Sequence, residues 1–202
     1  MPRVSPQHAL ARRRQILDAA LRRFADQGFH RTSMQDVFEE SGLSPGAVYR
    51  YFAGKEELVG AIVRETLAGL GEAAGRAIDG ADAPDPAALV GALLAALDRL
   101  PDRERRMRLA VQVWAEAARN PDVRACLRDA ADELRGRVRD ALVAAQRAGR
   151  MDPALDASAT AAAVLALLQG YILHRALFAG PRPAAFRRSA EALAGGLAGP
   201  PA

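Results

Sequence analysis

The side chains best able to catalyse a reaction or to hold a metal are few and scattered along this chain. Among 202 residues there are three histidines and one cysteine. His8, His30 and His174 lie far apart in sequence, and Cys126 has no second thiol for a disulfide or a thiolate metal site. There is no Ser/His/Asp grouping, no metal-ligand spacing and no glycine-rich phosphate loop. The sequence therefore predicts no catalytic residues, no metal site and no cofactor, and we expect a protein that is not an enzyme.

Two short helices joined by a tight turn hold the more informative side chains. Ser33-Met34-Gln35-Asp36 resembles a capping box with Asp in place of Glu, and Gly42 ends the helix that it begins. Ser44-Pro45 starts a second helix that runs to about Phe52, since serine caps well and proline suits the first helical position. The sequence predicts that Val37, Leu43 and Val48 face inward. The residues predicted to face outward are Pro45, Gly46, Ala47, Tyr49 and Arg50.

This pattern predicts a helix-turn-helix, although a plain helical hairpin in a bundle would have the same apolar spacing. The sequence of residues 28–58 favours the helix-turn-helix, because it closely resembles the DNA-binding signature of the TetR family. It reads GFHRTSMQDVFEESGLSPGAVYRYFAGKEEL. One departure is Phe38, where that family usually has alanine. We expect its bulk to alter how the two helices cross.

The resemblance implies how each side chain would meet DNA. The helix from Ser44 to Phe52 would enter the major groove, through apolar contacts and indirect readout. Gln35 is the candidate for a direct contact with adenine, although a solvent-facing glutamine is an equal alternative. The residues expected nearest the bases are Pro45, Gly46, Ala47 and Tyr49, and Ser44 is also expected at the DNA. Those expected at phosphates are Thr32 or Ser33, Tyr51 and Lys55, with Arg50 a weaker candidate.

Helical periodicity and proline punctuation continue through the rest of the chain, and no strand pattern appears. The fold class expected is all-α, with a three-helix helix-turn-helix domain over residues 1–54 and a larger helical domain over 55–202. Residues 1–8 are expected to form a loose arm, residues 79–86 a linker and residues 195–202 a frayed tail. The predicted helices span 9–27, 33–42, 45–52, 55–78, 87–100, 103–119, 122–148, 155–178 and 184–193.

Charge is concentrated at the N-terminal end. The chain has a formal net charge of +4. Residues 1–64 hold ten Lys or Arg against seven Asp or Glu, so +3 of the total lies there, which suits a polyanion partner. The uncharged run 157–173 is slightly short for a bilayer and has polar interruptions, so we interpret it as a buried helix. No membrane partner and a cytoplasmic location are expected.

By the same resemblance, the larger domain binds a small molecule and forms a homodimer. The sequence around residues 114–126 is similar to that of the C-terminal domain of the betaine-pathway repressor type. Pairing 155–178 and 122–148 with their copies would make a four-helix bundle, and a core helix inside a monomer is the alternative. An apolar or neutral effector is favoured over a polycation. The side chains most able to line its pocket are Met107, Gln112, Trp114, Gln169, Tyr171 and His174, although a side chain of each kind is more often plain core.

The function expected is therefore a DNA-binding transcriptional regulator that represses until a small-molecule ligand releases it from a double-stranded operator. A helical scaffold that binds only proteins and an unrecognised small enzyme remain the alternatives. Neither would show salt-sensitive DNA binding with a sequence preference.

Overall fold

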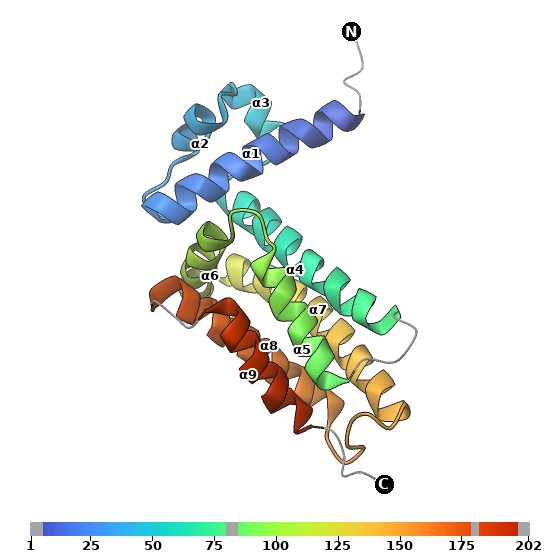
Figure 1. The fold of residues 1–202 in the computed structure, drawn as a ribbon. Coiled ribbons are helices and arrows are strands. Elements are labelled where there is room, and N and C mark those ends of the chain that lie inside the picture. Colours follow the sequence, from blue (N-terminus) through green and yellow to red (C-terminus); the bar gives the residue numbers. More distant parts are fainter. Residues whose placement is uncertain (1–5, 80–84, 179–181, 198–202) are drawn as a thin grey trace. The chain divides into compact units, whose positions relative to one another are not determined.

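The structure is a computed structural model that describes residues 6–79, 85–178 and 182–197, and within these ranges every regular element is a helix (Figure 1). The all-α expectation is confirmed. The helices are α1 (Pro6–Gln27), α2 (Met34–Ser41), α3 (Pro45–Tyr49), α4 (Lys55–Asp79), α5 (Pro86–Asp98), α6 (Arg103–Ala117), α7 (Pro121–Arg147), α8 (Ala157–Leu177) and α9 (Pro183–Gly195).

The helix bounds follow the sequence prediction with two notable differences. Helix α3 ends at Tyr49, three residues before the predicted end at about Phe52. Residues 6–8, expected in a loose arm, are the first residues of α1. Proline at the first position explains the early start, because it has no N–H that would need an intrahelical partner. The rest of the expected arm, the centre of the expected linker and the end of the expected tail (residues 1–5, 80–84 and 198–202) lie outside the described residues.

Contacts divide the described chain into two compact units. The first comprises residues 1–64 and 104–127, and the second residues 65–103 and 128–202. The long helices α4 and α7 contribute residues to both. This division follows packing, whereas the boundary after residue 54 was expected from function, and that functional boundary stays a prediction.

The first unit is built around one apolar cluster. Ile16, Leu21 and Phe24 of α1 are almost completely buried against Val37 of α2 and Val48 of α3. The cluster also takes in residues of α4, α6 and the start of α7, among them Leu58, Val59, Leu109 and Val123. The short helices α2 and α3 are therefore held by a core that is mostly contributed by longer helices, as helices of this length require.

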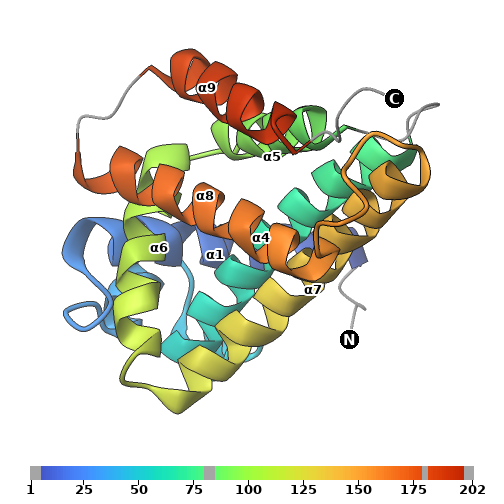
Figure 2. The same ribbon diagram turned by 90° about the horizontal axis from the view of Figure 1, so that it is seen from below.

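In the second unit α5 and α9 lie side by side, with α8 beside them (Figure 2). Leu89, Leu93 and Leu97 of α5 are buried. From α8, Tyr171 is fully buried, its ring 4.8 Å from that of Phe186 in α9 and its hydroxyl 2.5 Å from the Asp98 carboxylate at the end of α5. One side chain of α8 therefore joins three helices.

The expectation that the 157–173 run is buried is wrong for the single chain. Helix α8 is long and apolar enough, by length and composition alone, to cross a membrane, yet only 28% of its most apolar 18 residues is buried in the protein. Ala161, Val164, Leu168 and Tyr171 form its buried side. Its other side, described below, is exposed although it carries almost no charge.

Candidate DNA-binding interface

Local capping fixes the ends of α2. The Ser33 hydroxyl accepts a hydrogen bond from the Asp36 backbone N–H, and the Asp36 carboxylate accepts one from the Ser33 N–H at 2.7 Å, which completes the expected capping box. The hydrogen bond from the Ser33 hydroxyl also lowers the pKa of Asp36, because it stabilises the charged carboxylate. Gly42 ends α2 with φ 66, a left-handed conformation that a side chain would strain.

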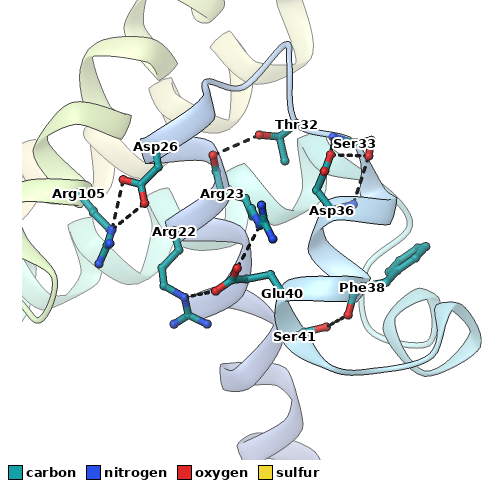
Figure 3. A network of polar contacts seen from close by, with 10 residues as sticks. All are labelled: Arg22, Arg23, Asp26, Thr32, Ser33, Asp36, Phe38, Glu40, Ser41 and Arg105. Atoms are coloured by element: carbon teal, nitrogen blue, oxygen red, sulfur yellow. Dashed lines mark hydrogen bonds and ion pairs between the residues drawn. The ribbon is translucent and has the colours of Figure 1, made fainter.

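Helix α1 braces α2 through polar contacts as well as the core (Figure 3). The Glu40 carboxylate contacts the guanidinium of Arg22 at 2.6 Å and that of Arg23 at 3.0 Å. The hydrogen bond from Arg22 is the main cause that lowers the pKa of Glu40. The Gln15 amide of α1 donates to the Ser41 carbonyl at 2.7 Å, one of the carbonyls left without a helical partner at the end of α2.

Helix α3 presents small and polar residues to solvent, as the sequence predicted. Its own Val48 is completely buried, and the Ser44 side chain caps the helix by accepting a hydrogen bond from the Ala47 N–H. Ala47 is half-buried; the exposed residues are Ser44, Pro45, Gly46, Tyr49 and Arg50. A side chain added at Gly46 would meet no atom of the protein within 4 Å, so internal packing does not require a glycine there. The backbone of α3 is therefore open to close approach by a partner.

The two candidates for a hydroxyl contact at the start of α2 differ in the structure. Thr32 is buried, and its hydroxyl lies within donating distance of the Gly28 carbonyl, at 2.9 Å, and the Arg23 carbonyl, at 3.2 Å. Ser33 is exposed. Of the pair, only Ser33 is exposed, and its hydroxyl donates to the Asp36 carboxylate, whereas Thr32 holds the loop after α1. A phosphate contact by Ser33 stays a prediction.

The other candidate contacts differ in exposure and in the partners that they already have. Gln35 is exposed on α2, and its Nε2 donates to Glu39 Oε1 at 3.0 Å. Tyr51 is half-buried at the edge of the core cluster. Lys55, at the first position of α4, donates from Nζ to the Phe29 carbonyl at 3.2 Å and lies 4.8 Å from the centre of the Phe29 ring. An ammonium has three N–H donors, so this contact uses one and orients the remainder.

Helix α6 contributes contacts that sequence reasoning missed. The Gln112 Oε1, expected to meet a ligand, accepts a hydrogen bond from the Phe29 backbone N–H at 2.9 Å. Asp26 at the end of α1 pairs with Arg105 and Arg108 of α6 at 3.2 and 3.1 Å. These partners are about 80 residues apart in sequence. Helical periodicity reflects only neighbouring residues, so it carries no information about such pairs.

The six expected ligand residues are divided between the two units, three in α6 of the first and three in α8 of the second. Met107 is buried in α6, where Gln112 and Trp114 are half-buried. On α8, Tyr171 is buried, but Gln169 and His174 are exposed. An apolar hollow of about 350 Å³ in the second unit is lined by none of the six; its walls include Val90, Ala163, Leu167, Leu193 and Leu197. That the six expected residues contact a ligand stays a prediction.

The exposed side of α8 carries no charge over most of its length. Ala162, Ala166, Gln169, Leu173 and Leu177 recur at helical spacing, and all are exposed. Leu193 of α9 is 74% exposed. By contrast, the exposed side of α7 carries ion pairs such as Arg135–Asp132 and Arg139–Asp140. An uncharged exposed helix face of this length is typical of a protein–protein interface.

Two family models cover most of the chain. Residues 16–62 match the bacterial regulatory proteins of the tetR family, and residues 85–198 match the C-terminal part of BetI-type transcriptional repressors. The chain belongs to the TetR family. The TetR assignment and the similarity to the betaine-pathway type are both confirmed, and the protein is a DNA-binding transcriptional regulator.

Relatives along the whole chain agree with the TetR assignment. BetI of Rhizobium meliloti, an HTH-type transcriptional regulator, is 30% identical over 187 residues, which cover 90% of this chain and 85% of that one. The structure of Salmonella enterica GusR matches with a TM-score of 0.79 at 26% identity, covering 94% of this chain and 96% of that one. A transcriptional regulator of Saccharomonospora viridis, solved in complex with choline, matches with a TM-score of 0.71 at 23% identity, over 92% and 95% of the two chains.

Proposed function

We propose that this TetR-family regulator binds a double-stranded operator as a homodimer, represses transcription from it, and is released by a small-molecule effector. The observation that carries the proposal is the exposed face of α3, which offers small and polar residues outward while Val48 anchors the helix in the core. A helix braced in this way can lie in the major groove with its backbone close to the base edges. A protein that binds DNA for regulation would act in the cytoplasm.

Within this proposal Gln35 reads a base and Lys55 holds a phosphate. One N–H of the Gln35 amide donates to Glu39, which leaves the second N–H and the carbonyl oxygen for N7 and N6 of an adenine. Lys55 is the only lysine of the chain, and it lies in the first turn of α4, where the positive end of the helix dipole adds to its charge. Its contact with Phe29 holds its position before DNA arrives.

The proposed function is tested by selecting bound sequences from random DNA and measuring affinity for them at several salt concentrations. We expect recovery of a sequence with two related half-sites, since a symmetric dimer binds a symmetric site. We also expect the logarithm of the affinity to fall linearly with the logarithm of salt concentration. Recovery of no sequence preference would favour a helical scaffold or an enzyme instead.

Removing Lys55 and Gln35 should have different effects on DNA binding. Lys55→Ala should weaken binding to all sequences about equally and reduce the salt slope by about one, because one phosphate contact is lost. Gln35→Ala should relax preference at one base pair, with a cost of about 1–3 kcal/mol at that position. Both effects are measured by titrating the selected operator and its single-base variants.

A matched control separates the Lys55 contact from a simple loss of charge. Arg139→Ala removes the same charge from α7, where Arg139 pairs with Asp140, and it should leave the salt slope unchanged. If Lys55→Ala and Arg139→Ala behave alike, Lys55 does not contact a phosphate.

The homodimer is expected to form through α8 and α9. From the sequence, 155–178 and 122–148 are both expected to pair with their copies in a four-helix bundle, but the ion-paired exposed side of α7 would be costly to bury. The uncharged side of α8 and the exposed Leu193 of α9 can be buried at no such cost. A second copy of the chain is the occupant that a symmetric operator requires.

The effector is expected to be largely apolar, and the hollow beside α5, α8 and α9 is its candidate site. The polar side chains on its wall already have partners: the Asp156 carboxylate accepts from the Ser158 and Ala159 N–H groups, and the Thr160 hydroxyl donates to the Asp156 carbonyl. Release of the operator is measured while neutral apolar compounds are added, with choline as a cationic comparison. Release by choline alone would place the effector site elsewhere.

A further inference from the structure

Tyr49 stands out on the proposed DNA-binding surface. Its side chain is 51% exposed, and between residues 28 and 62 of the described chain no other large apolar side chain is comparably exposed. It occupies the last position of α3, a helix of five residues. A side chain at the end of so short a helix has little neighbouring structure of its own to hold its ring in one orientation.

The support for that ring comes from Phe38 of α2. The two ring centroids lie 5.4 Å apart with an interplanar angle of 70°, an edge-to-face arrangement that aromatic pairs favour. Phe38 itself is only 8% exposed, so it is firmly packed while its partner is not. In Figure 3 its ring extends from α2 on the side away from the Arg22–Glu40 contact.

The backbone around Phe38 is also fixed. Its carbonyl lies 3.3 Å from the Leu43 backbone N–H and accepts from the Ser41 hydroxyl at 3.1 Å, so the turn between α2 and α3 is hydrogen-bonded to the residue whose ring supports Tyr49. The capping box at one end of α2 and the Glu40 contacts near the other hold the helix itself. Phe38 therefore provides a rigid platform.

We propose that Phe38 is a positioning residue for operator recognition: its ring fixes the orientation of Tyr49, and Tyr49 in turn selects among base pairs. This inference rests on the proposed function and names a specificity-determining pair within it. An exposed ring held in one orientation before binding loses less conformational entropy when it meets a thymine methyl or a sugar. The effect of Phe38 on DNA therefore passes through Tyr49.

A double-mutant cycle on the sequence selected by the parent protein tests this. Phe38→Leu keeps an apolar side chain in the core but removes the ring, and we expect about threefold to tenfold weaker binding, the worth of one aromatic pair. The loss should fall at the same base pair whose preference Tyr49→Ala relaxes. In the Tyr49→Ala background, Phe38→Leu should then cost little more, because the ring that it supports is already gone.

The control is Phe24→Leu, the same substitution at a fully buried ring of the same cluster that has no aromatic contact with Tyr49. It should lower thermal stability without changing base preference. A Phe38→Leu effect that is equal on all sequences, or that adds fully to Tyr49→Ala, would overturn the positioning role while leaving the proposed function intact. If the parent protein selects no sequence at all, the proposed function fails, and this inference fails with it.

Discussion

Ala166→Arg should turn the protein into a monomer and weaken operator binding by about a hundredfold or more. Ala166 lies on the exposed, uncharged side of α8. In a symmetric dimer the same patch is used by both subunits, so one substitution introduces two cations into the contact. Each would lose water without gaining an opposite charge. Once the subunits separate, each half-site must be bound independently, and the advantage of linkage disappears.

The result is checked by sedimentation velocity and by operator titration under identical conditions. Ala115→Arg is the matched control, since Ala115 is an exposed alanine of α6 in the other unit. It should leave both the mass and the affinity near those of the parent. An Ala166→Arg protein that remains dimeric would show that the interface lies on another surface.

Tyr171→Phe should lower the free energy of unfolding by about 1.5–3 kcal/mol, the range for a hydrogen bond to a charged group. The Tyr171 hydroxyl donates to Asp98 Oδ1, and Arg103 lies 3.7 Å from the same oxygen. Phenylalanine keeps the packing against Phe186 but leaves Asp98 without its closest donor. Denaturant unfolding measures the loss. Tyr49→Phe is the control, because its exposed phenol should contribute nothing comparable.

The contribution of Tyr171 should also depend on pH. Burial, and then the hydrogen bond to Asp98, raise the pKa of Tyr171 from 10.0 to about 12. The folded protein therefore holds this proton more tightly than the unfolded chain, so the stabilisation is complete below pH 10 and is lost as the pH rises towards 12. The difference in stability between parent and Tyr171→Phe should stay constant from neutral pH and shrink above pH 10. A difference that grows there would contradict the assigned cause.

Local signals in the sequence predicted the local structure well. Ser33 and Asp36 form the capping box, Ser44 and Pro45 begin α3, and Gly42 adopts the left-handed conformation. These features depend on residues within one helical turn, so a single sequence contains the information. The inward positions of Val37 and Val48 follow from helical periodicity for the same reason.

Features that depend on distant residues could not be predicted. Apolar composition made α8 look like a core helix, but composition cannot distinguish a face covered by the same chain from one left for another chain. The hydrogen bond of Gln112 to a backbone N–H 83 residues away has no local signal in the sequence. Phe38 was recognised as unusual, but its contact with Tyr49 depends on how α2 and α3 cross.

The backbone of Phe29 lies between α6 and the start of α4. Gln112 of α6 accepts a hydrogen bond from the Phe29 N–H, and Lys55 donates one to the Phe29 carbonyl. Any sliding of α6 along its axis must therefore either drag this residue with it or break the Gln112 bond. If Phe29 moves with α6, the carbonyl that Lys55 contacts moves as well, so a shift of one helix would change the position of the lysine expected at the DNA.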